Sequence, residues 1–91
     1  MDVKYLNYIL AIANRHNMTK AAEDLFVSQS SLSQYLSRLE QELGTPLFIR
    51  SKGELSLTSA GMLYVEAAQK VVKLQKELYQ NIAALSQKGR I

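Results

Sequence analysis

Residues 19–43 read TKAAEDLFVSQSSLSQYLSRLEQEL, and two helical patterns lie within them on either side of a short break. The first pattern predicts a helix over about residues 19–25, with Thr19 as its N-cap. Its inward side chains are expected to be Ala21, Ala22 and Leu25. Residues 26–28 are too few for anything but a tight turn before the next helix.

The second pattern predicts a helix over about residues 29–43, with Ser28 as its N-cap. Its buried face is expected to consist of Leu32, Leu36, Leu39 and Leu43. Serine and glutamine dominate the opposite face, which is polar but almost uncharged near its start. Serine is a mediocre helix former, so such a face is costly unless its short donors and acceptors contact a partner. A merely serine-rich surface is the alternative.

Another amphipathic helix is predicted upstream, over about residues 2–16. Asp2 can cap its start, and Arg15 and His16 suit the negative field at its C-terminal end. We therefore expect His16 to be a helix-end residue rather than a metal ligand or an acid–base group.

A small β-hairpin is predicted downstream, where Gly44 and Pro46 stop the helix. Residues 47–50 and 55–57 are the two strand candidates. They are joined by Ser51-Lys52-Gly53-Glu54, in which glycine is free to adopt a positive φ.

The last predicted helix runs from about residue 59 to residue 86 or beyond, after a Thr58 cap. At 1.5 Å per residue it would span roughly 40 Å, which is too long to pack wholly on the preceding segment. Its apolar residues follow a heptad, so a second chain is expected along this seam, rather than a single helix folded back on the head. The expected dimerisation residues are Tyr64, Val71, Leu74, Leu78, Ile82 and Leu85.

Composition excludes several classes of protein. The 91 residues suit one domain, and the absence of cysteine excludes disulfide scaffolds and thiolate zinc sites. A single histidine excludes a three-histidine metal site within one chain. No apolar run approaches the roughly 18 residues of a membrane span, and the N-terminus does not resemble a signal peptide. We expect a cytoplasmic, nucleoid-associated protein with no metal, no cofactor and no membrane partner.

Charge is distributed unevenly along the chain. Residues 1–57 hold six basic and six acidic residues, whereas residues 58–91 hold five basic and two acidic ones. No acid falls between Leu25 and Leu39, or between Leu43 and Gly53. These acid-free windows in a balanced segment weakly favour a surface that faces a polyanion.

Two helices joined by a three-residue turn form a helix-turn-helix, whose second helix reads the DNA major groove. Glutamine can bind the N6 and N7 edge of adenine, and serine can pair with several bases or with phosphate. The hairpin then corresponds to a wing, whose basic residues can meet phosphate or enter the minor groove. The candidate DNA-binding residues are Ser28, Gln29, Ser30, Ser33, Gln34, Arg38, Arg50 and Lys52.

Two other functions are alternatives to DNA binding. A helical protein-interaction adaptor would explain the seam, but neither the serine and glutamine face nor the basic wing. An enzyme would need a converging nucleophile–base or carboxylate pair. Glu23 and Asp24 diverge on a helix, as do Glu40 and Glu42, so we expect structural acids and no catalytic residue.

The run from residue 21 to residue 61 resembles the DNA-binding domain of the LysR-type transcriptional regulators. The resemblance extends over essentially the whole chain, and the opening helix with Tyr8 and Ala11 fits it too. The motifs that carry it are Ala21-Ala22, Leu25, Val27-Ser28-Gln29, Leu32-Ser33, Leu39-Glu40, Leu43-Gly44, Pro46-Leu47-Phe48, Arg50, Leu57-Thr58 and Ala60-Gly61.

The resemblance implies a mainly α protein with a small β-hairpin. Residues 1–58 would form a winged helix-turn-helix DNA-binding domain, and residues 59–91 a linker helix that pairs antiparallel into a homodimer. It also implies sequence-specific binding to imperfect palindromes in double-stranded DNA, by an activator or a repressor. Family members carry a further domain that binds a small-molecule effector. That domain is absent here, so we expect the 91 residues to be a piece of a longer regulator.

The sequence departs from the family pattern at three positions. Ser30 stands where proline is frequent, and Gln34 stands where arginine is common. The glutamine lacks the paired N–H donors with which an arginine binds guanine. Gly53 occupies a wing position that often carries arginine, with Lys52 one residue earlier. These departures leave the preferred bases and the wing contact open.

Overall fold

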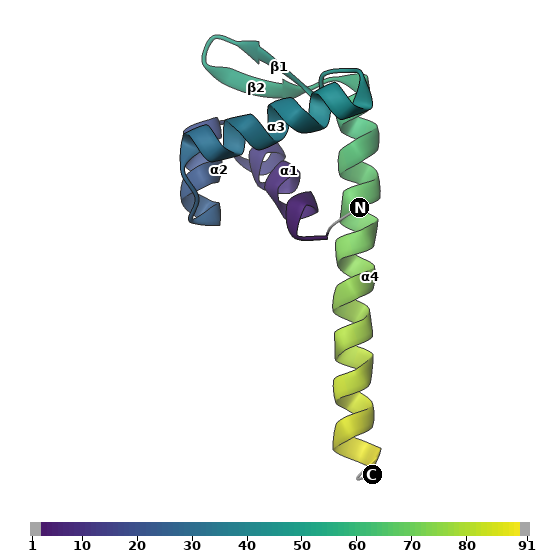
Figure 1. Ribbon diagram of the computed structural model, residues 1–91. Coiled ribbons are helices and arrows are strands. Elements are labelled where there is room, and N and C mark those ends of the chain that lie inside the picture. Colours follow the sequence, from purple (N-terminus) through teal and green to yellow (C-terminus); the bar gives the residue numbers. More distant parts are fainter. Residues whose placement is uncertain (1–2, 90–91) are drawn as a thin grey trace.

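The computed structural model describes residues 3–89, which form four helices and a two-stranded antiparallel sheet. The order is α1 (Val3–Arg15), α2 (Met18–Leu25), α3 (Gln29–Leu43), β1 (Phe48–Ser51), β2 (Glu54–Leu57) and α4 (Ser59–Gly89). The first three helices and the hairpin form a head, and α4 runs past it (Figure 1). The molecule is therefore elongated, with extents of 55 × 25 × 20 Å. The predicted winged helix-turn-helix with a long C-terminal helix is confirmed.

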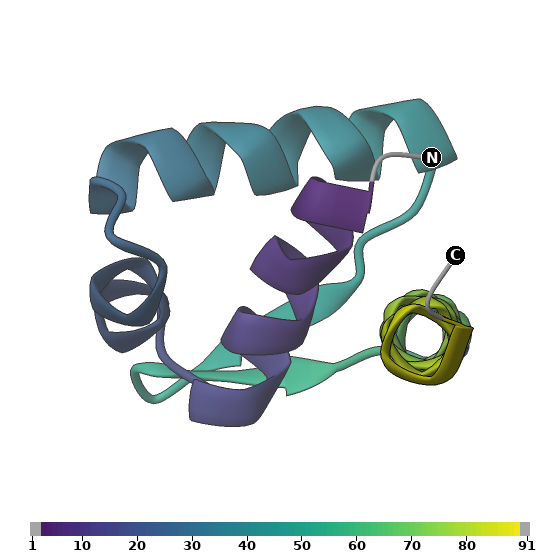
Figure 2. The same cartoon turned by 90° about the horizontal axis from the view of Figure 1, so that it is seen from below.

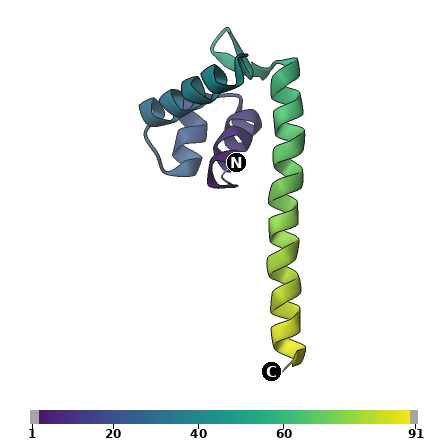
Figure 3. The same ribbon diagram turned by 45° about the vertical axis from the view of Figure 1, so that its right-hand side comes forward.

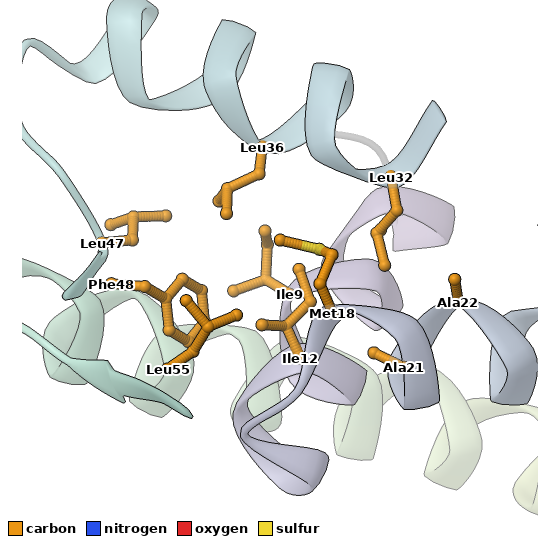
Figure 4. Close-up of a cluster of buried hydrophobic side chains, with 10 residues drawn as sticks. All are labelled: Ile9, Ile12, Met18, Ala21, Ala22, Leu32, Leu36, Leu47, Phe48 and Leu55. Carbon is orange, nitrogen blue, oxygen red and sulfur yellow. The ribbon is translucent and has the colours of Figure 1, made fainter. Parts of the chain in front are cut away.

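One apolar core lies between the three short helices and the hairpin. The side chains of Leu6, Ile9 and Ile12 on α1 are completely buried. The small residues of α2 leave room for its neighbours to approach closely. Figure 4 shows side chains from α1, α2, α3 and both strands pointing toward one another. The cluster consists of Ile9, Ile12, Met18, Ala21, Ala22, Leu32, Leu36, Leu47, Phe48 and Leu55.

The expectation that Thr19 caps α2 is wrong, because Asn17 occupies the N-cap. The Asn17 side-chain oxygen accepts a hydrogen bond of 2.8 Å from the Lys20 N–H. Asparagine is a better N-cap than threonine, and with Asn17 as the N-cap the helix begins at Met18. The buried Met18 side chain then joins the core. Asp2, the residue expected to cap the first helix, lies outside the described residues.

The helix-turn-helix itself is confirmed, with three residues between α2 and α3. Phe26 closes α2 in the left-handed region at φ 58°, where its N–H donates to the carbonyl oxygens of Ala22 and Glu23. Ser28 then caps α3 by accepting a hydrogen bond of 3.1 Å from the Ser31 N–H.

The leucine face of α3 is only partly buried. Leu32 and Leu36 belong to the core and Leu39 is half-buried, but the side chain of Leu43 is 46% exposed. The expectation that Leu43 is buried is therefore wrong. The physical reason is that the last turn of α3 borders an open groove instead of packing under another element.

The hairpin turns through two residues. Ser51 pairs with Glu54, and Lys52 and Gly53 between them have φ values of 52° and 79°. Two successive positive φ values match the right-handed twist of the flanking strands. The first strand begins and ends one residue later than predicted. The Leu55 N–H donates to the carbonyl oxygen of His16 at 3.0 Å, which ties the end of α1 to β2, as expected for a helix-end residue.

Two side chains fasten the hairpin and α4 to the head. A Glu40 carboxylate oxygen accepts hydrogen bonds from the N–H groups of Leu47 at 2.6 Å and Phe48 at 3.3 Å. The Thr58 hydroxyl donates to the Pro46 carbonyl at 2.7 Å and accepts from the Gly61 N–H at 3.0 Å. Glu40 is thus a structural acid, and the Thr58 cap is confirmed.

Helix α4 packs against the head only along its first turns. Gly61 and Ala68 are buried, and Tyr64 and Val65 are half-buried. Its 31 residues correspond to about 46 Å at 1.5 Å per residue, so much of the helix extends beyond the head (Figure 3). Within residues 3–89, no helix has both the length and the apolarity that a membrane crossing needs.

Candidate nucleic-acid interface

The polar face of α3 is open to solvent at the start of the helix. Gln29, Ser30 and Gln34 are exposed, and Ser33 is half-buried. The Ser28 hydroxyl accepts from the Ser31 N–H and donates to the Ser31 hydroxyl at 2.8 Å. The N–H groups of Gln29 and Ser30 lie in the first turn, where a helix supplies them with no acceptor four residues earlier. This end of α3 therefore presents side-chain amides, hydroxyls and backbone donors.

A hollow of about 260 Å³ joins this end of α3 to the wing. Gln29 lines it from α3, Arg50 and Lys52 from the hairpin, and Asn17 and Thr19 from the start of α2. We call it the wing hollow. The structure thus brings together Gln29 and the two basic wing residues, which are more than twenty positions apart in the sequence.

The cations of the wing hollow are free of internal ion pairs. Among the described residues, neither Arg50 nor Lys52 forms a salt bridge, whereas Arg15 is bound to both carboxylate oxygens of Asp24 at 2.9 Å. Glu54 is the one acidic side chain that lines the hollow. Unpaired cations beside the N-termini of two helices favour an anionic ligand such as a phosphate.

The other predicted site residues lie apart from this hollow. The N-cap Ser28 and the α3 residues Ser30, Ser33 and Gln34 do not line the hollow, and Arg38 lines a different groove near α1 and α4. Sequence reasoning missed the part played by Asn17 as a wall of the hollow. Its strong N-cap preference, directly before an apolar residue, is the signal that would have revealed the start of α2. Within residues 3–89, no group of three or more His, Cys, Asp or Glu side chains gathers around a metal-sized space.

The predicted dimerisation residues divide into two groups. Tyr64 and Val71 are half-buried near the head. Farther along α4, the exposed fractions are 67% for Leu74, 52% for Leu78, 54% for Ile82 and 67% for Leu85. A continuous row of large exposed apolar side chains is typical of an interaction surface. We call these six residues, from Tyr64 to Leu85, the α4 stripe.

The comparisons with known proteins all indicate the same family. Residues 3–62 match the model of the bacterial regulatory helix-turn-helix proteins of the lysR family. The chain is 41% identical over 87 residues to the uncharacterized HTH-type transcriptional regulator YcgK of Bacillus subtilis, covering 96% of this chain and 27% of that protein. It is 45% identical over 74 residues to the HTH-type transcriptional regulator BudR of Klebsiella aerogenes, covering 81% and 52%.

A solved structure agrees with these relatives. The DNA-binding domain of CbnR, crystallised as a complex with DNA, superposes with a TM-score of 0.82 at 32% identity, covering 94% of this chain and 99% of that one. The chain spans about a quarter of the length of YcgK and about half that of BudR. From its helix-turn-helix, its wing and its long final helix, the chain belongs to the lysR family of bacterial regulatory proteins.

Proposed function

We propose that this chain binds double-stranded DNA sequence-specifically, as the DNA-binding portion of a LysR-type transcriptional regulator. The observation that carries this proposal is the wing hollow, which unites the start of α3, the start of α2 and two unpaired cations. The similarity to a domain solved in complex with DNA supports it. In this proposal residues 1–58 form the DNA-binding domain and residues 59–91 the linker and dimerisation helix.

Each part of the interface has a different task. The first turns of α3 enter the major groove, where Gln29 and Ser33 reach base edges. Ser30 and Gln34 are available for bases or backbone on the same exposed face. Arg50 and Lys52 meet phosphates or the minor groove, and Ser28 positions the helix N-terminus toward a phosphate. Base contacts supply specificity, and the wing supplies affinity.

Two copies act together through the α4 stripe, with the helices antiparallel. A two-fold dimer presents its two reading helices in opposite directions, so its target is an inverted repeat. We assign no catalytic role to this portion and place it at the bacterial chromosome in the cytoplasm. The relatives YcgK and BudR are about two to four times as long as the segment that matches this chain. In this proposal the further part of such a regulator binds a small-molecule effector.

The Gln29→Ala variant is expected to lose about 1–3 kcal/mol of binding free energy for the preferred duplex, because its amide pairs with one base edge. Its loss for unrelated duplexes should be much smaller. Titration of labelled duplexes at one salt concentration measures both values. Gln41→Ala on the same helix is the matched control, because Gln41 lies beyond the reading turns. Equal affinity of both variants for the preferred duplex would show that Gln29 does not read a base.

The Arg50→Ala variant is expected to weaken binding to all duplexes alike, because a phosphate contact carries no sequence information. The slope of log affinity against log salt should become shallower by about one unit. Binding measured across a salt series gives this slope. Lys73→Ala, on the solvent face of α4, should leave the slope unchanged. A loss confined to one sequence would instead make Arg50 a base reader.

A further inference from the structure

His16 joins the end of α1 to the wing through two hydrogen bonds to one residue. It stands between α1 and α2 at φ 54°, a left-handed value that is uncommon outside glycine but that histidine tolerates better than most residues. Its backbone carbonyl oxygen accepts from the Leu55 N–H at 3.0 Å, and its ring Nδ1 lies 3.1 Å from the Leu55 carbonyl oxygen. Figure 2 shows the end of α1 crossing the hairpin.

The contact fixes which ring nitrogen of His16 carries hydrogen. A carbonyl oxygen can only accept, so Nδ1 is the donor to Leu55. The two hydrogen bonds then run in opposite directions, as they do between paired antiparallel strands. One hydrogen bond would let the hairpin pivot about it, whereas two to the same residue hold both the position and the orientation of β2. We call this pair of hydrogen bonds the His16–Leu55 clamp.

The clamp lies directly opposite a wing cation, because Arg50 and Leu55 are partners across the hairpin. Both backbone groups of Leu55 bond to His16 and so face away from β1. Arg50 and Leu55 are therefore a non-hydrogen-bonded pair, whose side chains lie close together on one face. Both residues line the wing hollow on that face. The clamp thus fixes the part of the hairpin from which Arg50 extends.

Hydrogen bonds from Glu40 and Thr58 hold the wing at its base. Glu40 accepts from the N–H groups of Leu47 and Phe48, and the Leu47 carbonyl oxygen accepts from the Thr58 N–H at 3.0 Å. Lys52 lies four residues beyond Phe48, or about 13 Å at 3.3 Å per residue, so a tilt of about 10° at the base moves it by about 2 Å. That displacement is enough to break a hydrogen bond to a phosphate.

We propose that His16 is a positioning residue for DNA binding, which sets the place of the wing cations beside the start of α3 through its ring hydrogen bond to Leu55. The inference rests on the DNA binding proposed above. His16 is not among the residues that line the wing hollow, so it acts through the strand rather than on the ligand. On its other side it lines, with Lys52 and Glu54, a hollow of about 410 Å³.

Glycine and asparagine at position 16 separate the ring hydrogen bond from the backbone conformation. Both residues adopt a left-handed φ readily, so both variants should fold, which urea unfolding followed by circular dichroism checks. Asparagine carries a nitrogen donor on Cγ, the same place as Nδ1 of histidine. The His16→Asn variant therefore keeps the hydrogen bond to the Leu55 carbonyl oxygen, and the His16→Gly variant loses it.

The His16→Gly variant is expected to bind a labelled duplex of mixed sequence about three- to tenfold more weakly than the unchanged chain, the range that one lost hydrogen bond accounts for. The slope of log affinity against log salt should become shallower by about one unit, as for Arg50→Ala. The His16→Asn variant should stay within about twofold of the unchanged chain. Titrations across a salt series measure all three proteins.

A double variant shows whether His16 acts through the wing. If it does, His16→Gly weakens binding much less in a chain that already carries Arg50→Ala, because the contact that His16 positions is gone. Losses that multiply in the His16→Gly/Arg50→Ala variant would show that the two residues act independently, which overturns the proposal.

The remaining outcomes separate this inference from the proposed function. Duplex binding that neither variant changes overturns the positioning role alone and leaves His16 as a helix-end residue. Equal losses in both variants overturn it too, because they assign the effect to the ring rather than to its hydrogen bond. Absence of binding by the unchanged chain at any salt overturns the proposed function and the positioning role together. Exchange of the Leu55 amide hydrogen then tests the clamp without DNA, since it should be faster in His16→Gly than in His16→Asn.

Discussion

The Leu78→Asp variant is expected to sediment as a monomer at concentrations where the unchanged chain is a dimer. Leu78 lies near the middle of the α4 stripe, and its side chain is 52% exposed in the single chain. Leu78 belongs neither to the buried cluster of the head nor to the side chains packed against it, so the head should stay folded when aspartate replaces it. In the dimer, two carboxylates would enter an apolar interface, at a cost of several kcal/mol. We expect the dissociation constant to rise by a factor of at least about one hundred, or about 3 kcal/mol.

Gln80→Asp provides the matched control for this experiment. Gln80 is exposed at almost the same height on α4, but it lies outside the apolar stripe. This variant should remain dimeric, and it should retain the affinity of the unchanged chain for an inverted repeat. Leu78→Asp should retain only the weaker affinity of a single head for a half-site. A Leu78→Asp protein that still sediments as a dimer would show that the copies meet elsewhere.

The Gly61→Val variant is expected to lose about 3 kcal/mol of unfolding free energy. Gly61 is buried where α4 joins the head, and an added Cβ would overlap the carbonyl oxygen of Leu47 and lie 2.9 Å from Leu57 Cδ2. The Leu47 carbonyl cannot retreat freely, because it accepts a hydrogen bond of 3.0 Å from the Thr58 N–H. Relief of the overlap must therefore shift α4 away from the head.

Urea unfolding followed by circular dichroism measures this loss, at one fixed protein concentration because the stability of a dimer depends on concentration. Gln69→Val carries the same new side chain at an exposed position of α4 and should change stability by no more than about 0.5 kcal/mol. If the two variants unfold at the same urea concentration, the close approach at Gly61 does not hold α4 to the head.

Local signals account for the parts of the fold that sequence predicts well. The residue range of α3 follows from Ser28 before it and Gly44 after it. The Ser28 hydroxyl accepts a hydrogen bond from a backbone N–H of the first turn, and the Gly44 N–H donates to carbonyl oxygens of the last turn. The hairpin and the start of α4 also depend on single residues, Gly53 and Thr58. These caps and turns depend on contacts within a few residues, so they can be predicted directly from the sequence.

Longer-range features cannot be predicted this way. The exposure of Leu43 depends on which element packs over the last turn of α3, and the helical spacing of leucines does not contain that information. The wing hollow depends on a hairpin that brings Arg50 and Lys52 beside Gln29. The apolar groove of about 610 Å³ beside the last turn of α3 is lined by residues from three helices, and Tyr5 and Tyr35 in its wall are thirty positions apart. Such sites follow from tertiary packing.

Sequence-specific DNA binding is tested by selecting bound duplexes from a random pool at moderate salt and sequencing them. We expect enrichment of an inverted repeat, with arm bases that the Gln29→Ala variant no longer selects. Binding that enriches no sequence and disappears as salt rises would reduce the chain to nonspecific phosphate contact and contradict sequence-specific recognition. Absence of binding at any salt would favour a protein-interaction adaptor instead.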